Sequence, residues 1–83
     1  AATLKEKRAV LQSLLRRIRN TGQVSVAEVD HQDKWQRSAI GLAVVSAEAG
    51  EAERLLAMAT MLVEAETRVE ILDIAQELEH YEL

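Results

Sequence analysis

The sequence contains no cysteine and only two aromatic residues, and no apolar run approaches the roughly 18 residues of a membrane helix. The absence of cysteine excludes a disulfide framework, a thiolate nucleophile and a thiolate metal site. The two aromatic residues, Trp35 and Tyr81, lie outside the middle of any predicted strand, so base stacking on an aromatic sheet face is not expected. No secretory signal pattern precedes the first predicted helix. We expect a cytoplasmic protein that does not associate with membranes.

Length and charge limit the fold and its partners. A chain of 83 residues predicts one domain over residues 1–83, in which folding buries about 60% of the unfolded surface. The net charge of −4 divides unevenly, because residues 1–41 carry +4 and residues 42–83 carry −8. A polyanion would be attracted to one side of such a molecule and repelled by the other. Indiscriminate nucleic-acid binding is therefore not expected, whereas oriented binding is compatible with the charges.

The first predicted element is a helix at about residues 4–20. Thr3 followed by Glu6 forms a capping-box pattern, and Gly22 suits the left-handed residue that closes a helix. One apolar stripe contains Leu4, Leu11, Leu14, Leu15 and Ile18, and a basic ridge beside it contains Lys5, Arg8, Gln12, Arg16 and Arg19. Such a ridge can bind successive phosphates. A solvated surface face is the competing interpretation, because no aromatic residue lies between the charges.

Two strands are predicted next, at about residues 23–30 and 36–46. Their large aliphatic residues alternate on one face, which should meet the helices. The other face is small and mildly apolar, and Gly41 within it predicts a bulge or a close backbone approach. A sheet face without polar residues is usually covered, here by a second subunit if the protein forms an oligomer.

A second helix is predicted at about residues 47–66, with Ser46 as its N-cap, and a last strand at about residues 69–78. The core stripe of this helix comprises Ala52, Leu55, Leu56, Ala59, Leu62 and Val63. Met58 and Met61 lie off that stripe and form an apolar patch. A homo-oligomer is expected, with an interface drawn from Ala39, Gly41, Ala43, Met58 and Met61.

The polar connection at residues 30–36 carries most of the distinctive chemistry. Glu28, Asp30, His31 and Asp33 offer metal ligands, but carboxylates in such loops commonly cap turns or pair with nearby Lys34 and Arg37. Catalysis would use His31 for proton transfer, Asp33 or Glu28 to orient it and Arg37 to hold an anion. Neither a nucleophile motif nor a glycine-rich phosphate loop accompanies these residues, so we predict no catalytic residues, no metal and no cofactor. Trp35 is expected to pack over the end of the core, and Gln32 and Gln36 to brace the hairpin.

Two motifs carry a family resemblance. The segments TLKEKRAVLQS at residues 3–13 and EVDHQDKWQR at residues 28–37 together resemble the bacterial YlxP-like family, which has no established function. The resemblance implies an α+β, ferredoxin-like sandwich of order βαββαβ, with two helices on one face of a mainly antiparallel sheet. The first strand of that order is absent from this chain. We therefore expect a vacant position in the sheet, explained by a missing N-terminal segment or by a replacement strand from another chain.

The resulting functional prediction is a non-catalytic binding module whose partner is RNA or a ribosomal component. The resemblance contributes to this choice, because genes of the family commonly lie beside those of translation initiation and ribosome-maturation factors. The predicted binding residues are Lys5, Arg8, Arg16, Arg19, Glu28, His31, Gln32, Asp33, Trp35, Gln36 and Arg37. The first alternative is a homo-oligomeric structural protein, and the second is a small enzyme that uses His31.

Overall fold

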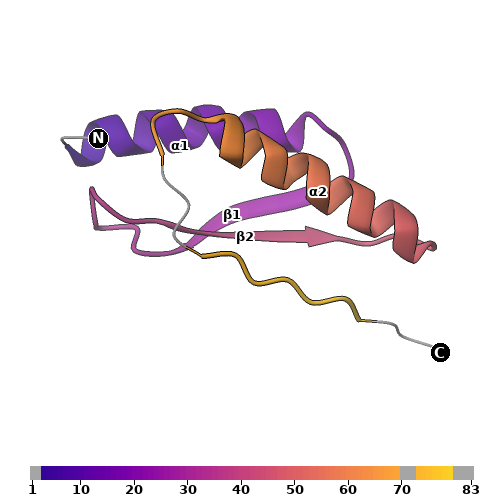
Figure 1. Ribbon diagram of the computed structural model, residues 1–83. Coiled ribbons are helices and arrows are strands. Elements are labelled where there is room, and N and C mark those ends of the chain that lie inside the picture. The colour runs from indigo at the N-terminus through magenta and orange to yellow at the C-terminus, as the bar shows by residue number, and fades with distance from the viewer. Residues whose placement is uncertain (1–2, 70–72, 80–83) are drawn as a thin grey trace.

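The computed structural model describes residues 3–69 and 73–79, and it contains two helices and two strands. Their order is α1 (Leu4–Arg19), β1 (Val24–Asp30), β2 (Ala39–Val44) and α2 (Ala49–Ala65). The two strands pair antiparallel, and both helices lie on the same face of the resulting sheet (Figure 1). This arrangement confirms the α+β class and is consistent with a ferredoxin-like sandwich. No helix in these two described ranges is long and apolar enough to cross a membrane.

Helix α1 begins and ends close to the predicted residues. The hydroxyl oxygen of Thr3 accepts a hydrogen bond from the Glu6 backbone N–H at 3.1 Å, so Thr3 caps one of the free amides of the first turn. The chain leaves the helix through Gly22, whose φ of 80° lies in the left-handed region. Four of the five predicted stripe residues are buried, namely Leu11, Leu14, Leu15 and Ile18. Leu4 is only half-buried at the start of the helix.

The hairpin places its large aliphatic residues beneath the helices. Val24 and Val26 are buried, and Ile40, Leu42 and Val44 pack against the core from β2. The pairing register shifts between Glu28 and Asp30, so Val29 is an extra residue in β1. Strand β2 begins at Ala39 rather than at about residue 36, because residues 32–38 form the turn and bends of the connection.

Gly41 lies close to a side chain and not to another backbone segment, which corrects the predicted close backbone approach. A Cβ atom added to Gly41 would lie 2.9 Å from Cγ1 of Val29, so the valine side chain occupies the space that a larger residue would need. Ala39 and Gly41 are half-buried and Ala43 is exposed.

Helix α2 packs its stripe against the core but begins later than predicted. Ala52, Leu55 and Ala59 are buried, whereas Leu56, Leu62 and Val63 are half-buried. The N-cap is Glu48 and not Ser46, which corrects the sequence prediction. Ser46 lies two residues earlier, where its hydroxyl accepts from the Glu48 N–H at 3.1 Å and donates to Glu51 at 3.2 Å.

The last predicted strand, at about residues 69–78, requires a correction. Residues 73–79 adopt no strand structure and all of them are exposed, while residues 70–72 lie outside the described part of the chain. In a ferredoxin-like sheet the last strand pairs with the first strand of the order, and no such strand lies within residues 3–69 and 73–79. The alternating aliphatic pattern around Ile74 and Leu78 therefore has no neighbouring strand to pair with in this structure.

Candidate functional site

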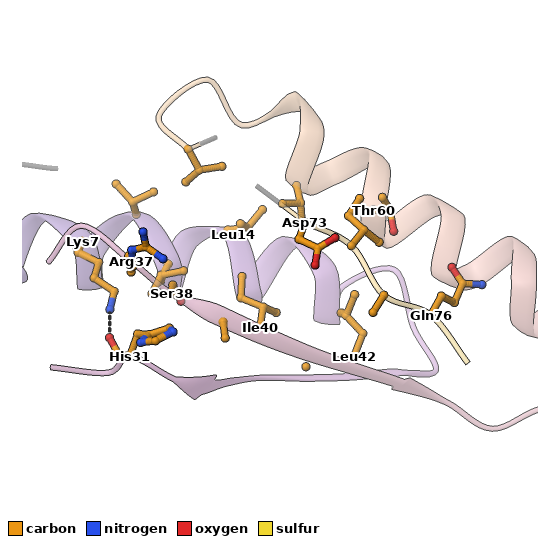
Figure 2. A pocket seen from close by; sticks show the side chains of 18 of the residues that line it. Lys7, Leu14, His31, Arg37, Ser38, Ile40, Leu42, Thr60, Asp73 and Gln76 are labelled. Carbon is orange, nitrogen blue, oxygen red and sulfur yellow. Dashed lines mark hydrogen bonds between the residues drawn. The ribbon is translucent and has the colours of Figure 1, made fainter. Parts of the chain in front are cut away.

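Lys7 connects the two sequence motifs. It projects from α1 toward the hairpin connection, where its ammonium group donates a hydrogen bond to the His31 carbonyl oxygen at 2.5 Å (Figure 2). The same nitrogen lies 2.9 Å from Oε2 of Glu28, and only 5% of Lys7 is exposed. A buried ammonium group is stable only when it is paired and hydrogen-bonded, and Lys7 meets both conditions. The cation therefore holds the hairpin against α1.

Glu28 completes this cluster from β1. Its carboxylate accepts a hydrogen bond from the Ser38 hydroxyl at 2.6 Å in addition to the contact with Lys7. Burial acts to raise the pKa of the Glu28 carboxyl, but the hydrogen bonds from Ser38 and Lys7 and the charges of Lys7 and Arg8 bring this pKa below its ordinary value. Gln32 donates to the Glu28 carbonyl at 3.2 Å, which confirms its predicted bracing role. Glu28 thus anchors the hairpin.

The hairpin connection presents the remaining polar residues to solvent. His31 has a φ of 60°, and its backbone N–H is held by the Asp30 carboxylate at 2.7 Å. His31 Nε2 lies 3.9 Å from Asp30 Oδ2, which is too far for the hydrogen bond that would orient a general base. Trp35 is 43% exposed, so it lies at the surface instead of sealing the core as predicted. Asp33, Gln36 and Arg37 are exposed, and within residues 3–69 and 73–79 no three potential metal ligands cluster.

The basic ridge of α1 lies beside this connection. Lys5, Arg8 and Arg16 are exposed and form no ion pair with any carboxylate in the described part of the chain. Arg19 is also exposed, and it donates a hydrogen bond to the Val26 carbonyl at 3.2 Å.

A shallow recess of about 290 Å³ joins the ridge to the hairpin connection. It is lined by Arg8, Leu11, Gln12, Leu15, Glu28 and Gln32. The structure therefore brings Arg8, Glu28 and Gln32 together, as the two sequence motifs suggested. Arg16 lies about 12 Å farther along the helix axis than Arg8, because each residue of an α-helix adds about 1.5 Å.

Two other arginines share ion pairs with a single carboxylate. Glu66, just after α2, accepts hydrogen bonds from Arg17 of α1 and from Arg68, each at 2.7 Å. The hydrogen bonds from the Arg68 side chain and backbone, followed by that from Arg17, hold the pKa of the Glu66 carboxyl well below its ordinary value. The sequence analysis missed this cluster, because Arg17 lies 49 residues from Glu66 in the chain. These contacts fix the end of α2 to α1.

A second and larger hollow lies between the helices, β2 and the C-terminal segment. This groove has a volume of about 780 Å³. Figure 2 shows Leu14 and Thr60 from the helices, Ile40 and Leu42 from β2, and Asp73 and Gln76 from the C-terminal segment around it. His31 and Arg37 line the end of the groove where β2 begins (Figure 2), and Gln36 is also among the lining residues.

Comparisons with known proteins agree with the resemblance carried by the two motifs. The family described as "Protein of unknown function (DUF503)" matches residues 1–76. The chain is 39% identical over 70 residues to "Uncharacterized protein YlxP" of Bacillus subtilis (strain 168), a match that covers 84% of this chain and 76% of that protein. No solved structure matches this chain. The chain therefore belongs to the DUF503 family of bacterial proteins, whose function is unknown.

Proposed function

We propose that this protein is a non-catalytic module that binds RNA through the ridge of α1 and the hairpin connection at residues 30–37. One contrast carries the proposal. Lys7 and Arg17 of the same helix form ion pairs with Glu28 and Glu66, whereas Lys5, Arg8 and Arg16 are exposed and form no ion pair in the described residues. The fold thus leaves a row of cations without ion pairs along one side of a rigid helix.

The dimensions of this row suit a phosphate backbone. From Lys5 to Arg19 the helix extends about 21 Å at 1.5 Å per residue, which offers room for several successive phosphates. Arg8 and Arg16 carry guanidinium groups, which bind phosphate oxygens through two parallel hydrogen bonds. The exposed ring of Trp35 adds a surface on which a single-stranded base can stack. A single-stranded RNA that tracks α1 and bends toward the connection would use both features.

The opposite charge of the rest of the molecule orients this binding. Residues 42–83 carry −8, and the exposed carboxylates of Glu53 and Glu64 lie on α2. RNA would be repelled from that helix and attracted to α1. A ribosomal RNA segment fits the same chemistry, so the proposal includes a ribosomal partner.

The salt dependence of RNA affinity tests this function. A fluorescein-labelled 12-nucleotide single-stranded RNA of mixed sequence is titrated by fluorescence polarisation at several concentrations of KCl. Four phosphate contacts predict a slope of about −2.8 in a plot of log affinity against log salt concentration, at about 0.7 per contact. The double variant Arg8→Gln/Arg16→Gln should make the slope shallower, at about −1.4, and weaken binding at low salt.

Arg54→Gln is the matched control for this test. Arg54 is an exposed arginine on α2 that donates a hydrogen bond to Met58 Sδ at 3.4 Å, so its removal changes the net charge without affecting the ridge. Equal effects of Arg54→Gln and a single ridge substitution would refute a specific ridge. No binding of the RNA at low salt by the folded protein would refute the proposed function.

A homo-oligomeric structural role is the alternative, and exposed aliphatic residues favour it. Val45 is 91% exposed, Met61 66% and Val29 64%, with Met58 beside Met61 on α2 at 38%. Monomeric proteins seldom expose large contiguous apolar patches, and Met58 and Met61 are neighbours on one helix. Light scattering at low and high salt separates the two functions, because apolar association persists or strengthens with salt whereas RNA binding weakens.

A further inference from the structure

A cation and an anion line the shallow recess between α1 and the end of β1 without forming an ion pair. Arg8 comes from α1 and Glu28 from β1, and both line this recess of about 290 Å³. The charge of Arg8 is close enough to act on the Glu28 carboxyl, yet no ion pair joins the two side chains. A ligand that carries both hydrogen-bond donors and acceptors can therefore bind between them.

The floor of the recess is apolar and its rim is polar. Four side chains come from one side of α1, because they follow the spacing i, i+3, i+4 and i+7; they are Arg8, Leu11, Gln12 and Leu15. Gln32 lines the recess from the hairpin connection. Apart from Leu11, no residue of this recess lines the larger groove beside β2, so the two hollows are separate. An apolar floor with a few polar groups is the usual composition of a small-ligand site.

The Glu28 carboxylate has one oxygen available to a ligand. Lys7 and Ser38 both contact Oε2, and no hydrogen bond from the described residues reaches Oε1. These two contacts fix the position of the carboxylate before a ligand arrives. An ionised carboxylate only accepts hydrogen bonds, whereas the guanidinium group of Arg8 only donates them. A matching ligand presents N–H groups to Glu28 and acceptor atoms to Arg8.

We propose that this recess binds a guanine base. The inference rests on the proposed function, because the base would belong to RNA whose phosphates lie on the ridge of α1. Guanine has N–H donors at two adjacent positions, N1 and N2, for Glu28, and the acceptors O6 and N7 for Arg8. The other three bases place an acceptor atom beside each donor on this edge, and that atom would be repelled by the carboxylate. Leu11 and Leu15 provide an apolar surface for the face of the ring.

Four fluorescein-labelled 12-nucleotide RNAs of equal charge test the recess by fluorescence polarisation. One is all uridine, and the others carry a single guanosine, inosine or adenosine at the centre. The guanosine RNA should bind at least about 10-fold more tightly than the all-uridine RNA, because a bidentate base contact gives discrimination of this order. Inosine lacks the N2 amino group and should bind at least about 3-fold more weakly than guanosine. Adenosine controls for the size of a purine and should bind like uridine.

Two charge-conserving variants locate the guanine contact. Arg8→Lys keeps the positive charge but loses the two parallel hydrogen bonds to O6 and N7, so the ratio of guanosine to uridine affinity should fall at least about 3-fold. Arg16→Lys makes the same change on the ridge outside the recess, and it should alter both affinities alike and preserve their ratio. Equal effects of the two variants on this ratio would overturn the inference. Glu28 is left intact, because it also anchors the hairpin.

The mononucleotides GMP and UMP separate this inference from the RNA function. Both carry the same charge, and each is titrated into the protein by isothermal calorimetry to about 5 mM. GMP should bind at least about 10-fold more tightly than UMP. If no RNA binds but GMP is preferred, the RNA function is refuted and the recess is a site for a free guanine nucleotide. If the guanosine and uridine RNAs bind equally, the guanine site is refuted and the RNA function stands. Equal binding of GMP and UMP would likewise overturn the guanine site.

Discussion

Replacing Lys7 with methionine tests the contact that joins α1 to the hairpin. Methionine retains an unbranched apolar side chain in the buried space but removes the ammonium group that binds the His31 carbonyl and the Glu28 carboxylate. Hydrogen bonds to charged groups contribute about 1.5–3 kcal/mol each. The cost of losing both is reduced because the Glu28 side chain, which is 16% exposed, keeps its hydrogen bond from Ser38 and some contact with water. We expect Lys7→Met to lower the free energy of unfolding by about 2–3 kcal/mol, or about 10–20 °C in Tm for a domain of this size.

Urea denaturation followed by circular dichroism at 222 nm measures this cost, with Lys5→Met as the control. Lys5 is an exposed lysine two residues away, and its replacement should change the free energy of unfolding by less than about 0.5 kcal/mol. Similar values for the two variants would refute the proposed anchor.

The cost of Lys7→Met should also depend on pH. The pKa of Glu28 is lowered in the folded state, so its ionised form contributes stability above the unfolded value of about 4.3 and loses that contribution as pH falls below it. The difference between wild type and Lys7→Met should therefore shrink in acid. A difference that stays constant between pH 7 and pH 3 would contradict the pairing of these two residues.

Two further perturbations address the Glu66 cluster and the hairpin. Glu66→Gln should lower the urea midpoint at pH 7, and this loss should fade below a pH of about 4, because a carboxyl with a depressed folded pKa stabilises only while it is ionised. Glu64→Gln, at an exposed position on α2, serves as its control, and a loss independent of pH would argue against the ion pairs with Arg17 and Arg68. Gly41→Ala should cost about 1–2 kcal/mol in thermal or urea unfolding, because its Cβ would meet the Val29 side chain. The same substitution in a Val29→Ala background should cost close to nothing, and an undiminished cost there would place the strain elsewhere.

Local signals in the sequence were sufficient to predict the helices and the hairpin. The Thr3 cap, the stripe through Leu11 and Leu14, and the alternation through Val24 and Val26 each depend on neighbours within a few residues. The tertiary structure only shifted the ends of these elements. Ser46 is an example. A serine can accept a hydrogen bond from a backbone N–H in the turn before a helix, as Ser46 does from Glu48, as readily as it can cap the first amides of the helix itself.

The last strand and the Glu66 cluster could not be predicted in the same way. The alternating pattern around Ile74 and Leu78 is compatible with a strand, but a strand exists only when a neighbour supplies hydrogen-bond partners, and sequence alternation does not identify that neighbour. The Glu66 cluster joins residues from different elements, which only the packing of α1 against α2 brings together.

The Lys7 contact was partly visible in the sequence. Lys7 precedes Leu11 by four residues and Leu14 by seven, which places it on the apolar stripe, and Glu28 continues the buried face of Val24 and Val26. A lysine on one buried face and a glutamate on another predict a pair if the two faces meet. The basic ridge was also predicted, whereas the ion pairs of Lys7 and Arg17, which lie on the same helix outside the ridge, depended on the fold.

Because Trp35 lies in the hairpin connection and not in the core, the tryptophan fluorescence of this protein does not report the packing of its core. The buried core consists of aliphatic residues and alanine, and the sequence contains one tryptophan, one tyrosine and no phenylalanine. Tryptophan emission therefore originates from the half-exposed hairpin connection and reports the solvent around that connection. Quenching by a ligand would locate contact at the connection without any label, whereas loosening of the core beneath the helices would leave the emission spectrum almost unchanged.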